Sequence, residues 1–337
     1  MTVGHIYIMV TGKCLRFGDE IRERRRMKTK PVGLRTNDVI GVVAPAGVLS
    51  DREALAKGLR FLHAMGFRTL VAKHLLAECG YLAGSDDQRL ADLMGMFARP
   101  EVRAILCLRG GYGALRLLAR IDFDFIRNNP KVFIGFSDIT ALHLAILKRA
   151  GLVTFHGPML ATDFGRSLSP YTRAKFLEVV LAGSGPTEIR NPLDGPAAFT
   201  ITPGIARGEL VGGNLTLITA LQGTPFEIET QGRILFIEEV GEQPYRLDRM
   251  LTQLRLAGKL RAAAGVVVGE CRGCETGTEG TFTVLQVLRD RLGDLGIPCF
   301  YGLAAGHGFH KATLPLGVQV TMDASRHTLR LEEAAVR

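Results

Sequence analysis

The chain has 337 residues, of which 47% are hydrophobic and 22% are charged, and its formal net charge is +9. This length exceeds one ordinary hydrophobic core and predicts two domains, and the composition is that of a globular protein. No apolar run reaches the roughly 18 residues of a spanning helix, so we expect no membrane partner.

Positive charge is concentrated at the N-terminus. Residues 1–34 hold eight Lys or Arg and three Asp or Glu, and the basic stretch IRERRRMKTK has no aromatic side chain that could stack on a base. We therefore expect a basic, disordered extension over residues 1–34 and no nucleic-acid partner. An RNA or DNA binder is the alternative, and it rests on residues 22–30 alone.

Cysteine usage and the start of the chain indicate the compartment. The six cysteines are scattered, as in a reducing environment, and the first residues lack the apolar core and cleavage site of a secretory signal. We expect a cytoplasmic protein. The sequence CRGC, from Cys271 to Cys274, lacks the second ligand pair of a zinc site, so we interpret it as two loop cysteines without a metal.

Strands and helices are predicted to alternate over residues 35–165, which we assign to an N-terminal α/β domain. Order is expected to begin near Asn37. This alternation is typical of a parallel sheet covered on both faces, whose ligands bind at the carboxyl ends of the strands. The patterns predict strands over residues 39–44, 68–74, 102–110 and 132–136, and helices over residues 51–65 and 85–99, from 114 onward and over 138–146.

The signals weaken after residue 165. Residues 166–204 are rich in Gly and Pro in their second half, and we expect them to form a linker. Residues 205–337 are predicted to form the second domain. Its expected elements are a strand, turn and helix over 208–221, a strand ending in acids over 232–242, an amphipathic helix over 245–258, a buried strand over 263–271 and a hairpin over 318–333.

Ser137 stands at a tight corner between a predicted strand and a predicted helix. Such a corner exposes a side chain at the edge of the sheet, beside backbone N–H groups, and both features help an attacking hydroxyl. The local pattern is G-x-S-D and differs from the G-x-S-x-G of α/β-hydrolases. The alternative interpretation is that Ser137 only caps the following helix.

A nucleophilic serine needs a base and a group that orients the base. Outside the helix and strand patterns, His156, His307 and His310 are the candidate bases. Glu238 and Glu239 end a buried strand, and the alternation of side chains along a strand directs them to opposite faces, so one of them can face a pocket. The residues alone leave both choices open.

Glycines near Ser137 offer backbone donors for an oxyanion. Residues 109–113, RGGYG, form a turn at the end of the neighbouring strand, and the N–H of Asp138 directly follows the serine. The turn lacks the GxGxxG pattern and the downstream acid of a dinucleotide site, so we expect no nucleotide cofactor.

Seven segments, in this order, resemble the LD-carboxypeptidases, also called muramoyltetrapeptide carboxypeptidases, a family that includes enzymes that inactivate microcin C. The resemblance covers most of the chain from about Val39 to Val320. The segments are GVVAPAG, AILCLRGGYGALRLL, FIGFSDITALHLAI, HGPM, GGNLTLI, LFIEEVGEQPYRLDRMLTQLRLAG and GHGFHKATLPLGV.

The resemblance implies an α/β fold with an N-terminal flavodoxin-like parallel sheet domain and a smaller C-terminal β-rich α/β domain. The active site is then expected in the cleft between the domains. It also implies a catalytic triad of Ser137, Glu238 and His307, with backbone oxyanion donors at Gly111 and Asp138.

The activity implied by the resemblance is that of a serine carboxypeptidase. Such an enzyme removes the terminal D-alanine from murein tetrapeptide, through an acyl-enzyme, during peptidoglycan recycling in the cytoplasm, and uses no metal or other cofactor. Family members are commonly homodimers. The carboxylate of the substrate needs a cation or N–H donors, and the candidate substrate-binding residues are Arg109, Tyr112, Asn214 and Arg246. For Arg109 and Arg246, a surface or ion-pair role is the favoured alternative.

Two other functions stay open at this stage. One is hydrolysis of a microcin C-type acyl-adenylate, which needs an aromatic side chain over the leaving group. The chain has no tryptophan, so Phe164, Tyr171, Phe176 and Phe199 are the available aromatics. The other is a non-catalytic binding module that keeps this fold.

Overall fold

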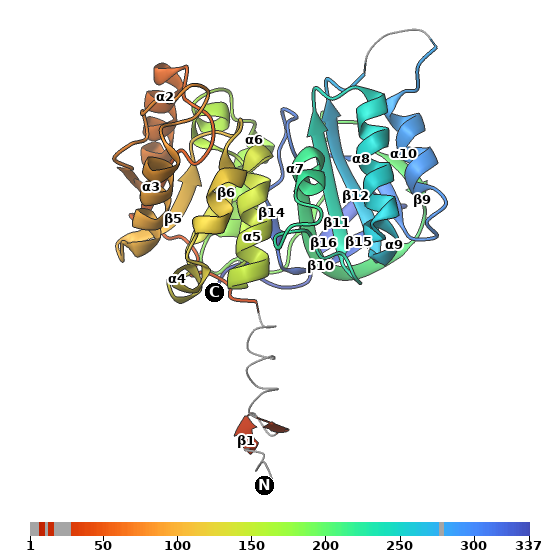
Figure 1. The fold of residues 1–337 in the computed structure, drawn as a ribbon, viewed down its shortest axis with the longest axis horizontal. Coiled ribbons are helices and arrows are strands. Elements are labelled where there is room, and N and C mark those ends of the chain that lie inside the picture. Colours follow the sequence, from red (N-terminus) through yellow and green to blue (C-terminus); the bar gives the residue numbers. More distant parts are fainter. Residues whose placement is uncertain (1–6, 11–12, 17–27, 276–279) are drawn as a thin grey trace.

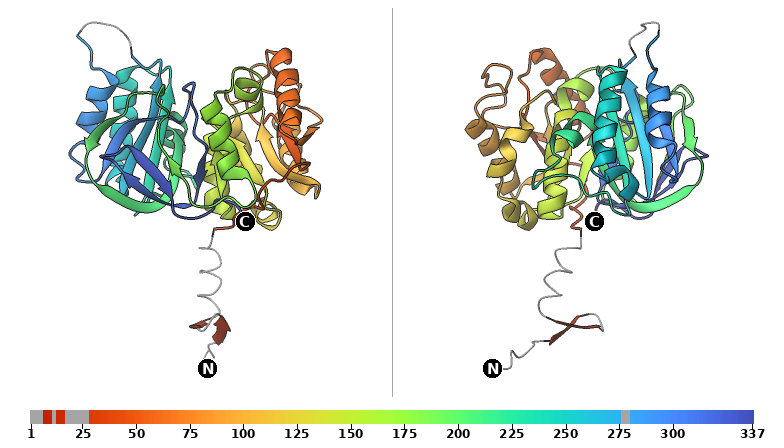
Figure 2. Two further views of the ribbon diagram at one scale, coloured as in Figure 1. Left: turned by 180° about the vertical axis from the view of Figure 1, so that it is seen from behind. Right: turned by 45° about the vertical axis from the view of Figure 1, so that its right-hand side comes forward.

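Two β-sheets lie side by side, each accompanied by helices (Figures 1 and 2). The computed structural model describes residues 7–10, 13–16, 28–275 and 280–337. Within these ranges no helix is both long enough and apolar enough to cross a membrane. The two sheets belong to the N-terminal and C-terminal halves of the chain, and the fold is therefore α/β with two layered units, as expected.

The first sheet has six strands in the order β14-β7-β6-β5-β3-β4. Strands β3 to β7 are all parallel, and their order along the sheet is that of flavodoxin-like folds. This confirms the predicted fold of the N-terminal domain. The strands are β3 (Val39–Val43), β4 (Arg68–Val71), β5 (Val102–Cys107), β6 (Val132–Gly135), β7 (Thr154–His156) and β14 (Leu314–Leu316).

Helices and short turns connect these strands. Local signals in the sequence start two of the helices: Asp51 accepts a hydrogen bond from the N–H of Ala54, and Ser85 forms a capping box with Gln88. The connecting elements are α2 (Arg52–Ala64), α3 (Asp86–Ala98), η1 (Ala114–Arg120), α4 (Phe123–Asn128), η2 (Ser137–Ile139), α5 (Thr140–Ala150), η3 (Leu160–Phe164) and α6 (Pro170–Val180).

The second sheet has eight strands in the order β8-β16-β15-β10-β11-β12-β13-β9. Strands β10 to β13 are parallel, and the outer strands pair antiparallel. The elements are β8 (Glu188–Ile189), β9 (Phe199–Thr202), β10 (Ile205–Asn214), α7 (Leu215–Ala220), β11 (Ile234–Val240), α8 (Pro244–Leu256), α9 (Lys259–Ala262), β12 (Gly265–Arg272), α10 (Val284–Leu292), β13 (Cys299–Leu303), β15 (Gln319–Asp323) and β16 (Thr328–Leu331).

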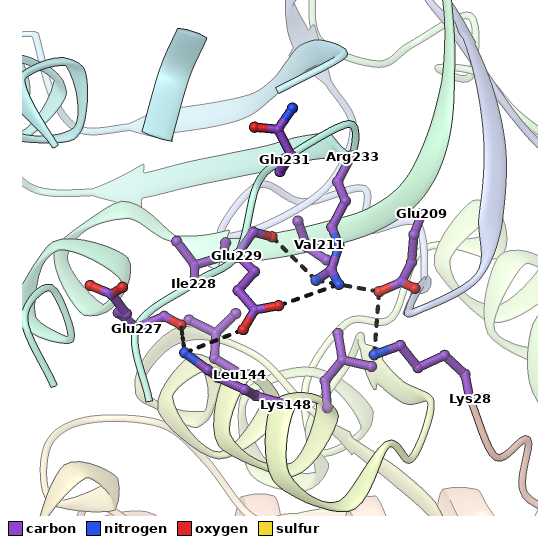
Figure 3. A pocket seen from close by; sticks show the side chains of 11 residues that line it. Lys28, Leu144, Lys148, Glu209, Val211, Glu227, Ile228, Glu229, Gln231 and Arg233 are labelled. Atoms are coloured by element: carbon purple, nitrogen blue, oxygen red, sulfur yellow. Dashed lines mark hydrogen bonds and ion pairs between the residues drawn. The ribbon is translucent and has the colours of Figure 1, made fainter. Parts of the chain in front are cut away.

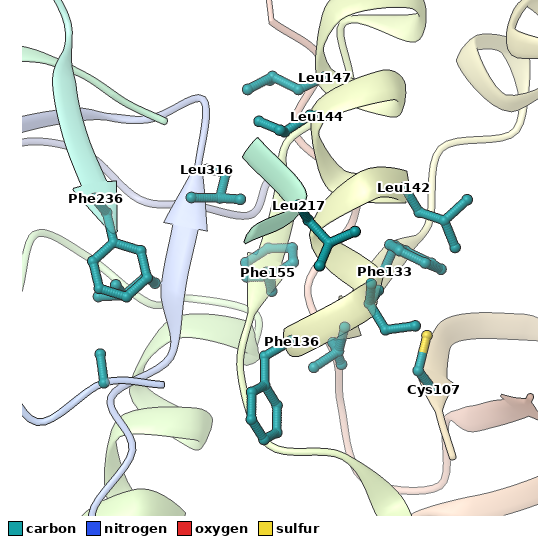
Figure 4. Packing of buried hydrophobic residues seen from close by; sticks show 14 of the residues in the cluster. Cys107, Phe133, Phe136, Leu142, Leu144, Leu147, Phe155, Leu217, Phe236 and Leu316 are labelled. Atoms are coloured by element: carbon teal, nitrogen blue, oxygen red, sulfur yellow. The ribbon is translucent and has the colours of Figure 1, made fainter. Parts of the chain in front are cut away.

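An apolar seam joins the two units. Strand β14 belongs to the C-terminal half but pairs antiparallel with β7 of the first sheet, with Leu316 opposite Thr154. The ring of His156 on β7 contacts Phe236 on β11, with centroids 5.0 Å apart. Phe155, Phe236 and Leu316 are fully buried (Figure 4). Because these side chains form one continuous core, the two units hold a fixed relative position.

Ion pairs line a second part of this junction. Lys148 of α5 donates to the carbonyl of Glu227 at 3.0 Å. Arg233 lies between the carboxylates of Glu209 and Glu229, at 3.5 and 3.7 Å, and Lys28 faces Glu209 (Figure 3). These residues surround a pocket of about 520 Å³ in which the charges of both signs balance.

The N-terminal segment corrects one expectation. Contacts with the domain start before Asn37, because backbone hydrogen bonds join residues 28–34 to it: Thr29 donates to the carbonyl of Gly151 at 2.7 Å and Gly33 to that of Arg337 at 3.0 Å. Further upstream, β1 (Tyr7–Val10) pairs with β2 (Lys13–Arg16). The rest of the expected disordered extension, residues 1–6, 11–12 and 17–27, lies outside the described residues.

Residues 166–204, the expected linker, contain helix α6 and strands β8 and β9. The helix starts at a Ser169 cap followed by Pro170, a local signal that the sequence analysis passed over. Phe176 anchors α6 by packing on Phe164, with ring centroids 5.3 Å apart. The domain limits themselves stay a prediction.

Candidate active site

Ser137 occupies a strained corner at the carboxyl end of β6. Its φ angle is +63°, a backbone conformation that residues other than glycine rarely adopt. Ser137 is the first residue of the turn η2, which leads into α5. The N-cap positions of η2 and α5 are Phe136 and Ile139, and neither makes a side-chain cap. The capping interpretation of Ser137 therefore does not apply.

Glycine makes room for this corner. A Cβ atom at Gly110 would lie 2.8 Å from the Cβ of Ser137 and 3.0 Å from its Oγ, which is closer than real Cβ contacts. The carbonyl of Gly110 accepts a hydrogen bond from the N–H of Gly47 at 3.1 Å. The loops after β3, β5 and β6 thus meet at one edge of the sheet, where ligands of parallel sheets bind.

Asp138 fixes the backbone beside the serine. Its buried carboxylate accepts a hydrogen bond from the N–H of Ala114 at 2.8 Å, which ties η2 to the start of η1. Burial raises the pKa of Asp138 to about 6, although the Ala114 hydrogen bond and the Arg89 guanidinium act in the opposite direction. The side chain therefore anchors the turn that carries both the Ser137 hydroxyl and the Asp138 N–H.

Glu238 and His307 form a close pair from two elements of the second unit. The Nδ1 atom of His307 lies 2.7 Å from Oε2 of Glu238. The Glu238 side chain is fully buried, and its Oε1 accepts no hydrogen bond from any residue that the structure describes. A Cβ atom at Gly306, whose φ is +101°, would lie 2.5 Å from Oε2, so glycine permits this approach. A carboxylate at Nδ1 leaves Nε2 as the free nitrogen of the ring.

Glu239 faces the other way and is fully bonded. It accepts hydrogen bonds from the amide of Asn214 at 2.9 Å, from the N–H and hydroxyl of Thr216 at 2.8 Å each, and from the N–H of Val240 at 2.9 Å. The alternation along β11 therefore directs Glu238 toward His307 and Glu239 into the second unit. The structure thus places Glu238, and not Glu239, beside His307.

The other candidate bases lie elsewhere. His156 is buried, with its ring near those of Phe136 and Phe236, and burial lowers its pKa well below the ordinary value. His310 contacts the hydroxyl of Ser169 at 3.1 Å and Asp194 at 3.4 Å. Of the three candidates, His307 is the one that lines a pocket with Ser137.

This pocket has a volume of about 260 Å³ and lies where the two units meet. It contains three cationic side chains, and one of them, Lys311, pairs with the single lining carboxylate, Asp163, at 2.7 Å. The pocket therefore carries net positive charge and suits an anionic ligand. Its lining residues are Arg109, Gly110, Gly111, Phe136, Ser137, Met159, Thr162, Asp163, Arg272, His307 and Lys311.

Four residues were expected to bind substrate, and the structure brings one of them, Arg109, to the pocket. Asn214 is buried away from the pocket, where it bonds Glu239 and caps α7 through the N–H of Leu217. Arg246 pairs with Glu242 on the surface of α8. Tyr112 is exposed and packs edge-on against Tyr81, with centroids 5.4 Å apart.

Sequence reasoning missed two cations of the pocket. Lys311 lies four residues after His307 in a segment that was already singled out, and its ammonium group also donates to the carbonyl of Gly308 at 2.7 Å. Arg272 lies inside the CxxC and donates to the carbonyl of His307 at 2.9 Å. Asp163, the partner of Lys311, carried no recognisable signal. The described residues include no cluster of three metal-ligating side chains.

Taken with its fold, the pocket defines a two-domain α/β protein whose site lies at the carboxyl edge of a flavodoxin-like sheet. Residues 40–157 match the LD-carboxypeptidase N-terminal domain, and residues 207–322 match the LD-carboxypeptidase C-terminal domain. The chain belongs to the LD-carboxypeptidase family.

Similar proteins agree with this assignment. The probable murein peptide carboxypeptidase of Bacillus subtilis is 44% identical over 306 residues, which cover 90% of this chain and 94% of that protein. The muramoyltetrapeptide carboxypeptidase of Oxalobacter formigenes has a crystal structure that matches with a TM-score of 0.78 and 31% identity, over 88% of this chain and 98% of that one. The microcin C7 self-immunity protein MccF has the same fold, with a TM-score of 0.85 and 24% identity over 91% of this chain and 99% of that one.

Proposed function

We propose that this protein is a serine-type LD-carboxypeptidase that removes the terminal D-alanine from murein tetrapeptide. The observation that carries the proposal is the Glu238–His307 pair, joined at 2.7 Å, in one pocket with a serine on a strained corner. This combination of carboxylate, imidazole and hydroxyl is the arrangement that activates a serine for acyl transfer.

In the first step, Nε2 of His307 accepts the proton of Ser137 while the serine Oγ attacks the carbonyl carbon of the scissile bond. Glu238 holds the imidazole through Nδ1 and stabilises the cation that forms. The backbone N–H groups of Gly111 and Asp138 are the proposed donors to the oxyanion. The hydrogen bond from the Ala114 N–H to the Asp138 carboxylate holds this turn, so that the backbone N–H of Asp138 stays beside the serine.

The second half of the reaction reverses these roles. The imidazolium of His307 protonates the leaving nitrogen, D-alanine departs, and the acyl group stays on Ser137. His307 then takes a proton from a water molecule, whose oxygen attacks the ester carbonyl, and returns that proton to the serine oxygen as the ester bond breaks. The site needs no further cofactor for these steps, because each proton moves between the substrate, water and the triad.

Recognition of the terminal carboxylate follows from the charge of the pocket. Arg109, Arg272 and Lys311 line it beside a single carboxylate, Asp163, so an anionic group enters a favourable potential. Lys311 is held by Asp163 and by the Gly308 carbonyl, which leaves one N–H of the ammonium for a ligand. A free carboxylate at the end of a peptide fits this role.

The relatives named as murein peptide and muramoyltetrapeptide carboxypeptidases support this substrate class. We place the activity in the recycling of peptidoglycan peptides in the cytoplasm, by a homodimer. Gel filtration with light scattering tests the assembly, and a monomer would contradict that part of the proposal.

The proposal is tested by mass spectrometry. Purified protein is incubated with murein tetrapeptide beside Ser137→Ala, and the loss of one alanine is followed. We expect loss with the wild type and a rate lower by about 10⁴-fold or more with the variant, because removing the triad serine abolishes acyl transfer. No loss with the wild type would contradict the muropeptide function.

A second candidate is hydrolysis of an acyl-adenylate, because MccF shares the fold and was solved with glutamyl sulfamoyl guanosine. This reaction needs an aromatic side chain over the base. Phe164 and Phe176 are buried in the core and so are not available, whereas Phe199 is 40% exposed and Tyr171 is half-buried. Turnover of an aminoacyl sulfamate ester or acyl-adenylate, compared with murein tetrapeptide in the same assay, separates the two candidates.

A further inference from the structure

The cysteine pair of the CRGC sequence lies beside the active-site pocket and has no part in the proposed mechanism. Strand β12 ends at Arg272, and the N–H of Cys274 then donates to the carbonyl of Cys271 at 3.3 Å. Gly273, at the third position of this β-turn, has a φ of +67°. Such a turn brings its first and last Cα atoms within roughly 7 Å, which overlaps the distance that a disulfide spans.

The two thiols lie at the ends of this turn, and the Cys274 thiol donates to the carbonyl of Arg272, between the two cysteines, at 3.8 Å. The Cys271 side chain lowers the pKa of Cys274, and burial opposes this; the backbone N–H groups of Glu242 and Gly241 lower it further. The Cys274 side chain, together with burial, raises the pKa of Cys271. The thiolate is the nucleophile in thiol–disulfide exchange, so Cys274 is the attacking sulfur.

Two of the other described cysteines lack this setting. Cys107 and Cys299 lie within buried strands, where burial raises the pKa of each thiol. Cys271 and Cys274 are also buried, but they belong to a turn at the surface, and Arg272, Gly273 and Glu275 around them are exposed. A small displacement of the turn therefore opens the pair to a reagent.

The turn is coupled to the pocket. Arg272, between the two cysteines, donates from Nη1 to the carbonyl of His307 at 2.9 Å and lines the pocket with it. In the β11–β12 register, Cys271 lies opposite Glu239, the neighbour of Glu238. A change in the conformation of the turn can therefore displace both the loop that carries His307 and strand β11, which carries Glu238.

We propose that Cys271 and Cys274 form a reversible disulfide, a redox modification site whose closure lowers the activity of the neighbouring pocket. The oxidant is a low-molecular-weight disulfide. The Cys274 thiolate attacks one of its sulfurs and releases one thiol; the Cys271 sulfur then attacks the mixed disulfide and releases the second. The protein loses two hydrogens, and the oxidant is reduced to two thiols.

Closure must bring the two sulfurs to a bond length of about 2.05 Å. The turn contracts, and Arg272 at its second position moves relative to the His307 carbonyl that it holds. His307 is then no longer fixed for proton transfer to and from Ser137. The effect on activity rests on the proposed function, whereas formation of the disulfide does not.

The experiment equilibrates the full chain in mixtures of reduced and oxidised glutathione, blocks free thiols and digests with trypsin. Cleavage after Arg261, Arg272 and Arg289 places the two cysteines in separate peptides, residues 262–272 and 273–289. A disulfide holds these peptides together. We expect the joined species to rise with the oxidised fraction, kcat/KM to fall tenfold or more in parallel, and dithiothreitol to reverse both.

Three variants control the assignment. Cys271→Ser and Cys274→Ser should keep the activity of the reduced enzyme and lose its sensitivity to oxidised glutathione. Cys79→Ser, which removes an exposed cysteine elsewhere, should keep that sensitivity. If Cys271→Ser or Cys274→Ser fails to fold, the tryptic peptides of the wild type still show whether the disulfide forms.

Two results would overturn the proposal. Peptides that stay separate at the oxidised end refute the disulfide, and joined peptides with an unchanged kcat/KM refute its coupling to the site. If murein tetrapeptide is not hydrolysed at all, the peptide measurement still reports on the disulfide, so failure of the proposed function is seen separately.

Discussion

Glu238 and Glu239 are adjacent on β11, both buried, and yet they stand in opposite surroundings. Glu239 accepts four hydrogen bonds from Asn214, Thr216 and Val240. Glu238 has one close partner, His307, and an oxygen that accepts no hydrogen bond from the described residues. Glu239, whose oxygens are all hydrogen-bonded, holds the fold, whereas Glu238 contacts His307, which lines the pocket.

The difference shows where each carboxylate contributes. A saturated carboxylate joins β11 to the start of α7, so its removal leaves several buried donors without an acceptor. A carboxylate with one partner, such as Glu238, instead orients that partner and stabilises its charge, here the imidazole of His307. Substitutions at these and related positions should therefore separate activity from stability.

The largest effect is expected for Glu238→Gln. An amide at this position is nearly isosteric but supplies no charge to the imidazolium and favours the wrong tautomer, so kcat should fall by about 10³- to 10⁴-fold. The free energy of unfolding should change by less than about 1 kcal/mol, because one hydrogen bond is altered. Kinetics and urea denaturation measure the two effects, and a fall in kcat below tenfold would contradict the triad assignment.

Glu239→Ala should show the reverse. Loss of the acceptor leaves buried donors of Asn214, Thr216 and Val240 unpaired, which costs about 2–4 kcal/mol of unfolding free energy. The fraction that stays folded should keep kcat/KM within tenfold of the wild type. Urea denaturation measures the cost, and unchanged stability would show that these hydrogen bonds do not hold the unit.

Asp138 is a third buried carboxyl group, with one hydrogen bond and a pKa of about 6, against an ordinary 3.8. The folded state holds this proton more tightly than the unfolded chain, so stability from this group is present at pH 4 and is lost as pH rises through 6. Asp138→Asn removes this dependence. Between pH 4 and pH 7 the wild type should therefore lose about 2–3 kcal/mol of unfolding free energy that the variant does not lose. The difference, variant minus wild type, increases by this amount. Equal differences at the two pH values would contradict the raised pKa.

The smallest effect is expected for Arg246→Ala. This side chain pairs with Glu242 on the surface of α8, and such exposed pairs contribute little. We expect kcat/KM to stay within twofold, with the same assay applied to Lys311→Ala as a pocket-facing comparison. A tenfold loss in Arg246→Ala would place this arginine in substrate binding.

Much of the fold follows from local signals in the sequence. The buried run of β3, the Asp51 cap and the Ser85 capping box identify the alternating strands and helices of the N-terminal unit. The segments that were missed, residues 28–34 and α6, are held by tertiary contacts. Thr29 bonds the Gly151 carbonyl, and Phe176 packs on Phe164, although α6 also has a local start signal at Ser169 and Pro170 that was overlooked.

The site was less accessible to sequence reasoning. The corner at Ser137 could be anticipated from its neighbours, but the choice of Glu238 needed the family resemblance, because alternation separates two acids without saying which faces the pocket. Asn214 was expected in the pocket and instead bonds Glu239. Lys311 reaches the pocket because Asp163, 148 residues earlier in the sequence, holds its ammonium group at 2.7 Å. That contact exists only in the folded chain.

Strand β14 has a consequence for the order in which the protein can mature on the ribosome. The sheet that carries Ser137 receives its sixth strand only when residues 314–316 have been synthesised, after almost the whole second unit. The same late segment, directly upstream, brings His307. A nascent chain that ends before this point has neither the proposed base nor the edge strand that covers β7. The proposed nucleophile is thus made early, but its proposed base joins it only when translation is nearly complete.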